Sequence, residues 1–309
     1  MFRLLVLVLC LSVSFAAHAA EHLKIGVLPA GDSLIIHAAA EDGFFAARGL
    51  DVEPVPFQSA LELGAAMRAG ALHGHFGDII NVLTQNESGS PQRIVATTSR
   101  AGQGMRYFGL ALAPGEKAGS LEELKGAEAA TAGATIVDYL LTRLLRVRGL
   151  PDGYFSRQEI RQIPIRVQML AAGQVRCAFL PEPLISLLEK RGSRILLDDR
   201  ELDEPLAVVA LRRDILDAPG GAALAQAFRT ALADAARAIN SRPDAYRDMM
   251  VRKGLLSRSA DNYAMLRYEE PCPLGLPSEK EVLRYAEWMA EQKILKTIPA
   301  FEDIVWHDR

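Results

Sequence analysis

Strand-like and helix-like segments alternate along most of this chain, and this alternation restricts the possible folds more than any other feature. The predicted strands span residues 23–27, 50–55, 74–77, 94–98, 108–113, 128–131, 175–180 and 206–211. Helical patterns, such as those at 136–145 and 167–173, separate them, and the chain beyond about Pro219 is predicted to be helical. Such alternation is typical of an α/β protein with mostly parallel sheets.

A glycine-rich stretch at residues 101–104 divides the alternation of strands and helices into two successive α/β segments. The chain has 309 residues, and one hydrophobic core of that size would be unusually large. We therefore predict two α/β units and a helical C-terminal region, with no internal sequence repeat and no low-complexity linker.

Capping signals mark several predicted helix starts. Ser59 and Glu62 have the spacing of a capping box, and Thr135 and Asp138 have a similar spacing. Asp78 follows a predicted strand directly and is a good N-cap residue. These polar side chains are therefore candidates both for helix capping and for binding.

The first residues predict export. Arg3 precedes an apolar run at 4–15, and residues 17–19 have the small-x-small pattern of a signal-peptidase site. An apolar run of about 12 residues is too short for a ~30 Å hydrocarbon core, which needs roughly 20. We therefore expect residues 1–19 to be a signal peptide, cleaved near Ala19, and the mature protein to be soluble in the periplasm.

The balance of acidic and basic residues excludes the class of strongly basic proteins that bind polyanions. Lys and Arg number 35 against 38 Asp and Glu, for a formal net charge of −3, and the basic residues form no blocks. Nucleic-acid-binding domains usually show such blocks or patches. We expect neither nucleic acid nor an anionic membrane surface as a partner.

Few residues suggest metal or thiol chemistry. Removal of the signal peptide leaves Cys177 and Cys272, which in an oxidising compartment either form a disulfide or remain separate buried thiols. His73 and His75 lie two residues apart on a predicted strand, but no third ligand has matching spacing. We therefore expect no metal site and no cofactor.

Five segments, in collinear order, carry a family resemblance. They are GFFAARGLDVEPVPF at 43–57, ALELGAAMRAGALHGHFGD at 60–78, SLEELKG at 120–126, MLAAGQVRCAFLPEPL at 169–184 and SEKEVLRYAEWMAEQKILKTIPAFEDIV at 278–305. Together they resemble the nitrate/sulfonate/taurine group of ABC-importer solute-binding proteins, which includes relatives that bind thiamine-precursor pyrimidines. The resemblance spans the mature chain from about Leu23 to Trp306.

The resemblance implies a two-lobed type II periplasmic-binding-protein fold with a ligand cleft between the lobes. Lobe I would consist of residues 20–106 plus 207–309, and lobe II of residues 107–206. It also implies a non-enzymatic, monomeric protein that delivers a small polar solute to a membrane permease and ATPase complex. A sulfonate, a nitrate-like anion and a pyrimidine precursor are the solutes considered.

Two other functions stay open at this point. A protein with the same lobes can report its ligand to a membrane receptor as a sensor. Relatives of the fold also act as enzymes of the thiamine-pyrimidine pathway, but they carry a cysteine-rich run, whereas Cys177 and Cys272 stand alone here.

Ligand contacts are expected where strands end and helices begin, because free N–H groups and helix dipoles there favour anionic or strongly polar ligands. The candidate binding residues are Asp32, Ser33, Gln58, Ser59, Asp78, Ser99, Arg100, Gly133, Ala134, Thr135 and Glu182. Arg100 could hold an oxyanion through two hydrogen bonds. The resemblance implies ligand-side positions for Asp32 and Ser33, a helix-start motif at 133–135, and a family hallmark at Glu182.

The carboxylates near these positions make the charge of the ligand uncertain from sequence. Asp32, Asp78, Asp138 and Glu182 all fall near predicted strand ends or helix starts. Several carboxylates would repel an anion unless arginines or capping bonds neutralise them. A neutral, amine-bearing or zwitterionic ligand therefore stays open beside an anionic one.

Overall fold

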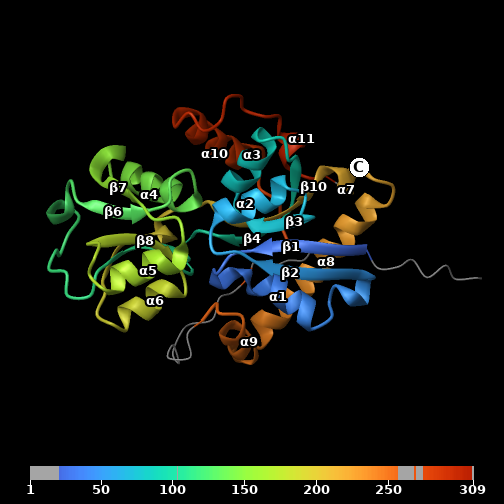
Figure 1. Ribbon diagram of the computed structural model, residues 1–309, viewed down its shortest axis with the longest axis horizontal. Coiled ribbons are helices and arrows are strands. Elements are labelled where there is room, and N and C mark those ends of the chain that lie inside the picture. Colours follow the sequence, from blue (N-terminus) through green and yellow to red (C-terminus); the bar gives the residue numbers. More distant parts are fainter. Residues whose placement is uncertain (1–20, 103, 257–267, 269–273, 308–309) are drawn as a thin grey trace, which may run out of the picture.

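The computed structural model describes residues 21–102, 104–256, 268 and 274–307. The predicted signal peptide at 1–19 and Cys272 lie outside the described residues. The described chain forms two five-stranded sheets, each covered by helices, and these make two lobes side by side (Figure 1).

The sheet of the first lobe combines the N-terminal strands with one strand from much later in the chain. Its strands are β1 (Glu21–Val27), β2 (Leu50–Pro56), β3 (Gly74–Gly77), β4 (Gln92–Arg100) and β10 (Pro205–Arg212). They are arranged in the order β2-β1-β3-β10-β4. Strand β1 is parallel to β2 and β3, whereas β10 is antiparallel to both β3 and β4.

The sheet of the second lobe repeats this topology. Its strands are β5 (Phe108–Leu112), β6 (Glu128–Thr131), β7 (Ser156–Glu159), β8 (Cys177–Pro181) and β9 (Ile195–Asp198), in the order β7-β6-β8-β5-β9. Strand β6 is parallel to β7 and β8, whereas β5 is antiparallel to β8 and β9. In each lobe the antiparallel strand is the first one after the chain crosses from the other lobe. The repetition is topological, and no sequence repeat accompanies it.

Most helices follow strands, as the alternation predicts. The first lobe contains α1 (Leu34–Glu41), α2 (Ala60–Arg68), α3 (Ile79–Glu87), α7 (Arg213–Asp217), α8 (Gly221–Ser241), α9 (Arg247–Arg252), α10 (Glu279–Glu291) and α11 (Phe301–Ile304). The second lobe contains α4 (Ile136–Val147), α5 (Ile163–Ala171) and α6 (Leu184–Glu189), and short 3₁₀ turns lie at 31–33, 46–48, 122–124, 152–154, 199–201 and 243–246. Among the described helices, none combines the length and the apolar character that a membrane crossing requires.

Predicted N-caps form at Ser59 and Asp78 but not at Thr135, and the Glu62 side chain accepts the Gln58 N–H at 3.1 Å and not the Ser59 N–H that a full capping box requires. The Ser59 hydroxyl accepts a hydrogen bond from the Glu62 N–H at 3.2 Å, and the Asp78 carboxylate accepts one from the Asn81 N–H at 2.8 Å. Thr135 precedes α4, but its hydroxyl donates to the Ala132 carbonyl instead of capping the helix. A capping box at that position is therefore absent.

Three elements of the second lobe were not predicted from the sequence. Strand β7 has the polar sequence Ser-Arg-Gln-Glu and lies at one edge of its sheet, and β9 lies at the other edge. A polar sequence such as that of β7 is common at a sheet edge, because an edge strand buries less surface. Strand β9, in contrast, is the short apolar segment Ile-Leu-Leu-Asp, which was not recognised as a strand. Helix α6 begins directly after Pro183, in a segment for which no helix was predicted.

The two lobes are also tied together at the second crossover. Glu204, which is 1% exposed, accepts hydrogen bonds from the Tyr139 hydroxyl at 3.0 Å and from Arg143 Nε at 3.1 Å. Its carboxylate also pairs with Arg284 Nη1 at 2.7 Å, and the Tyr139 ring stacks on Tyr285 at 4.1 Å. These contacts join α4 of the second lobe to α10 of the first.

Cys177, His73 and His75, the residues considered for thiol or metal chemistry, pack or form hydrogen bonds within the fold. Cys177 is buried in β8, and desolvation raises the pKa of its thiol to about 12. His73 Nδ1 accepts the Lys24 N–H at 2.9 Å, whereas His75 is fully buried and desolvation lowers its pKa to about 4. Within the described ranges, no group of three or more His, Cys, Asp or Glu side chains could hold a metal ion.

Candidate ligand-binding site

A cavity of about 70 Å³ lies between the two lobes. The first lobe lines it with Leu28, Ala30, Asp32, Ser59, Ala60, Leu61, Phe76, Gly77, Asp78, Leu206 and Ala207, and the second with Phe108, Ala132, Thr135, Ile136, Val137, Arg161, Ile163, Arg166 and Pro181. Many of these residues follow the carboxyl ends of β1, β3, β6 and β8. Ligands of open α/β sheets bind at such strand ends.

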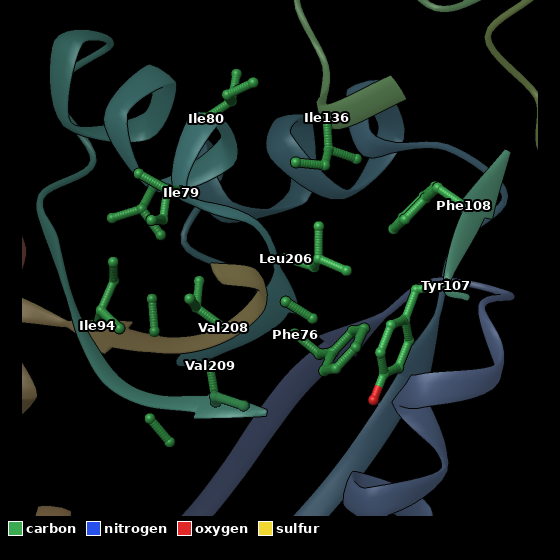
Figure 2. Packing of buried hydrophobic residues seen from close by; sticks show 14 of the residues in the cluster. Phe76, Ile79, Ile80, Ile94, Tyr107, Phe108, Ile136, Leu206, Val208 and Val209 are labelled. Atoms are coloured by element: carbon green, nitrogen blue, oxygen red, sulfur yellow. The ribbon is translucent and has the colours of Figure 1, made fainter. Parts of the chain in front are cut away.

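The walls of the cavity are largely apolar. Figure 2 shows Phe76 and Leu206 of the first lobe and Phe108 and Ile136 of the second directed toward one region of space. An apolar lining with a few polar groups is the usual composition of a small-molecule site, in which the polar groups set the orientation of the ligand.

Asp32 is one of the buried polar groups. It lies in the turn between β1 and α1, is 6% exposed, and its Oδ2 accepts the Ser99 hydroxyl at 2.9 Å. Its backbone carbonyl accepts the Tyr268 hydroxyl at 2.9 Å. Desolvation raises the pKa of the Asp32 carboxyl to about 6. A carboxyl in this environment favours a cationic or hydrogen-bond-donating group beside it.

Asp78 is the second buried carboxyl of the cavity. It caps α3 and is 4% exposed, and both of its oxygens accept from Asn81 Nδ2 at 3.1 Å. Burial raises the pKa of this carboxyl to about 6. The capping bond therefore explains the position of Asp78, and the lining of the cavity adds a second possible role.

Arg166 is the charged residue that the sequence analysis missed. It lies on α5, is 1% exposed, and its Nη1 donates to the Ile160 carbonyl at 2.9 Å. Its Nε has no hydrogen-bond partner among the described residues. Desolvation lowers the pKa of the guanidinium to about 10, so it stays charged at neutral pH. Its spacing from Leu170, the other buried residue of α5, is the sequence signal that places it on the inward face.

The start of α4 forms part of the rim. The Thr135 hydroxyl is engaged with Ala132, so the first N–H groups of α4 have no side-chain cap from Thr135. Arg161 lines the same rim and pairs with Glu159 at 2.7 Å, and the Gly133 N–H donates to that carboxylate at 2.8 Å. Glu159 therefore neutralises Arg161.

Of the eleven predicted binding residues, the cavity brings together Asp32, Ser59, Asp78 and Thr135. Ser33 and Ser99 are fully buried behind it, where Ser33 donates to the Ala30 carbonyl and Ser99 to Asp32. Gln58 and Ala134 line neighbouring hollows instead, and Gly133 binds Glu159.

Arg100 and Glu182 lie outside the cavity lining and are engaged elsewhere. Arg100 Nη1 pairs with Glu281 Oε1 at 2.6 Å and with Asp203 Oδ1 at 3.1 Å. Glu182 is 5% exposed and pairs with Arg106 at 2.6 Å. The charges of Arg100 and Glu182 are therefore balanced by other side chains of the protein. Arg100 was expected to contact the ligand, but the buried arginine that lines the cavity is Arg166.

The two lobes also contact each other directly. The Gly31 N–H donates to the Glu182 carbonyl at 3.1 Å, and the Ile163 N–H donates to the Gln58 carbonyl at 3.4 Å. Gln162 Nε2 donates to Glu62 Oε1 at 3.2 Å. The lobes are therefore in contact in this structure.

Comparisons with known proteins agree with this architecture. Residues 16–252 match the model of the NMT1-like family, whereas no curated protein matches the sequence. The alkanesulfonate-binding protein SsuA from Xanthomonas axonopodis pv. citri, bound to MOPS, is similar with a TM-score of 0.75 and 18% identity over 93% of this chain and 99% of that chain.

Two further solved structures are similar. A ligand-binding component of an ABC-type import system from Staphylococcus aureus gives a TM-score of 0.73 at 19% identity, covering 93% of this chain and 96% of that chain. The periplasmic nitrate-binding protein NrtA from Synechocystis PCC 6803 gives a TM-score of 0.68 at 16% identity, covering 92% and 84%. These similarities confirm the predicted two-lobed periplasmic-binding-protein fold.

Proposed function

The chain belongs to the NMT1-like family, and we propose that it is the periplasmic solute-binding component of an ABC importer. It captures a small polar solute between its lobes and delivers it to a permease and ATPase complex in the membrane. The observation that carries this proposal is the cavity between the lobes, which holds buried charged groups from both. Closure of two lobes over a ligand is the usual mechanism of such receptors.

The solutes that we consider for this chain follow from the ligands named for the similar structures. Those proteins are named for binding alkanesulfonates and nitrate. For this chain we propose a solute of comparable size and polarity: a sulfonate, a nitrate-like anion or a pyrimidine precursor. The candidate contacts are Asp32, Ser59, Asp78 and Thr135, together with Arg166.

We further propose that the role is non-enzymatic. Among the described residues, no cysteine lines the cavity, and Cys177 lies buried in β8 with a pKa raised to about 12. A thiol needs its thiolate form to act as a nucleophile, so this cysteine is poorly suited to covalent catalysis. The proposed function therefore consists of binding and releasing the solute without changing it chemically.

The remaining parts of the proposal concern the whole protein. Residues 1–19 act as the signal peptide and the mature chain works in the periplasm as a monomer. The lobes comprise residues 20–106 plus 207–309 and residues 107–206, and the chain crosses between them near Arg106 and near Glu204. The first crossover is held by the Tyr107 N–H, which donates to the buried Asp199 carboxylate at 3.0 Å.

A thermal-shift screen of the mature protein tests the proposal. The panel contains alkanesulfonates, nitrate, bicarbonate, thiamine-pathway pyrimidines, amino acids and polyamines. A ligand at one hundred times its Kd should stabilise the protein by about 2.7 kcal/mol. Native mass spectrometry then checks for one bound molecule per chain, recovered chemically unchanged. Turnover of the bound molecule, or stabilisation by no solute, would contradict the proposal.

A further inference from the structure

The two lobes present opposite charges to the cavity. The first lobe contributes the carboxyls of Asp32 and Asp78, which are 6% and 4% exposed. The second lobe contributes the guanidinium of Arg166, which is 1% exposed. The cavity therefore has an acidic wall on one lobe and a basic wall on the other.

These buried charges do not neutralise one another. In the described part of the chain, no ion pair joins Arg166 to a carboxylate, and its side-chain hydrogen bond goes to a backbone carbonyl. The side-chain bonds of Asp32 and Asp78 come from neutral donors, the Ser99 hydroxyl and the Asn81 amide groups. A buried charge without an ionic partner is unfavourable. A molecule in the cavity that supplies the missing partners would remove this penalty on both walls.

Apolar side chains from both lobes also line the cavity. Phe76 and Leu206 of the first lobe and Phe108 and Ile136 of the second face the cavity (Figure 2). Such surfaces favour an apolar body, either a ring or a short carbon chain. A fully inorganic anion would leave them without a partner.

We infer that the ligand is a small amphoteric molecule, with a nitrogen group held by Asp32 and Asp78, an oxyanion held by Arg166, and an apolar body between Phe76 and Phe108. This inference rests on the proposed function and narrows its solute class. Because the two walls belong to different lobes, a ligand with both ends adds an ionic contact to each lobe, beside the direct contacts that already join them. A ligand with one charged end would bind one lobe and leave the other without its ionic partner.

Calorimetric titration with matched compounds tests this inference on the mature protein. One series is 4-aminobutyrate, butyrate and butylamine, and the other is 4-(aminomethyl)benzoate, 4-methylbenzoate and 4-methylbenzylamine. In at least one series the zwitterion should bind about tenfold or more tightly than either singly charged analogue, the effect of one charge-assisted contact.

Variants then assign each end of the ligand to its wall. Arg166→Gln should weaken the zwitterion and the acid but leave the amine unchanged, whereas Asp32→Asn should weaken the zwitterion and the amine but leave the acid unchanged. Arg166→Lys retains the charge without the planar fork and should restore part of the affinity. Arg176→Gln is the control, because Arg176 is half-exposed and pairs with Glu116 away from the cavity. Circular dichroism confirms that each variant is folded.

The outcomes separate this inference from the proposed function. An acid or an amine that binds as tightly as its zwitterion refutes the amphoteric ligand but leaves the receptor function standing. The same holds if all six compounds fail while the protein is stabilised only by solutes that lack either the nitrogen group or the oxyanion. Stabilisation by an amino acid or another amphoteric solute of the screen supports the inference. If neither these compounds nor the solute screen gives any binding, the proposed function fails as well.

Discussion

Replacing Asp78 with asparagine should stabilise the unliganded protein at neutral pH. The pKa of this carboxyl is raised by burial from 3.8 to about 6. A shift of about 2 units corresponds to about 3 kcal/mol by which burial of the ionised carboxyl disfavours the folded state. The amide has no charge to bury, so Asp78→Asn should recover most of this free energy.

The local structure should tolerate this change. Asparagine is as good an N-cap as aspartate, so the bond from the Asn81 N–H is retained. The Asn81 Oδ1 has no hydrogen-bond partner among the described residues. Rotation of the Asn81 amide would let this oxygen accept a bond from the new amide at position 78. The expected gain is therefore not offset by a lost cap.

The difference between the two proteins should depend on pH in a defined direction. The folded wild type binds a proton at position 78 more tightly than the unfolded chain does, so its relative stability rises as the pH falls through about 6. The advantage of Asp78→Asn should be about 3 kcal/mol at pH 7.5 and should vanish below about pH 4. Other titrating groups, such as His75, cancel in this difference.

Urea denaturation of both proteins between pH 3.5 and 7.5 measures the effect. Asp214→Asn is the matched control, because Asp214 is exposed and Arg212 lowers its pKa, so that loss of its charge should not stabilise the protein. A variant at position 78 that is less stable than the wild type at pH 7.5, or a difference that does not change with pH, would refute the reasoning.

Three further substitutions test other parts of the structure. Ser59→Ala removes the cap of α2 and should lower the free energy of unfolding by about 1 kcal/mol, measured by urea denaturation. Glu204→Gln leaves the guanidinium groups of Arg143 and Arg284 without their buried carboxylate partner and should lower the free energy of unfolding by about 3 kcal/mol. Equal stability of the variant and the wild type would contradict the role of Glu204 in joining the lobes. Arg100→Ala should leave the calorimetric affinity for the ligand unchanged, because Arg100 pairs with Glu281 outside the cavity; a large loss of affinity would place Arg100 in the site after all.

The central strands could be predicted because they are buried on both faces. Strands such as β5 and β8 are buried along their whole length, which gives continuous apolar runs. Strands β7 and β9 lie at the sheet edges and have only four residues each. Strand β7 is polar, so no apolar pattern marks it, whereas the apolar run of β9 is too short to distinguish a strand from other structure. The predicted alternation therefore gave the fold class correctly but left both edges of the second sheet undefined.

The candidate site was predictable where a polar residue lies in the short segment between a strand and the next helix. The cavity residues found in this way are Asp32, Ser59, Asp78 and Thr135, which follow β1, β2, β3 and β6. Arg100 also ends a strand, but its partner Glu281 lies far away in the sequence, and no local pattern shows such a pairing. Arg166 was missed because the helical pattern was recognised only from residue 167, although the helix begins at Ile163.

Native mass spectrometry of the mature protein, purified without denaturation from cells that export it, tests the central claim most directly. We expect one small molecule bound per chain, released on unfolding with its covalent structure intact, and lost from the Arg166→Gln variant. A protein that carries no small molecule and takes up none from the solute screen, or one that converts the molecule into a product, would contradict the account.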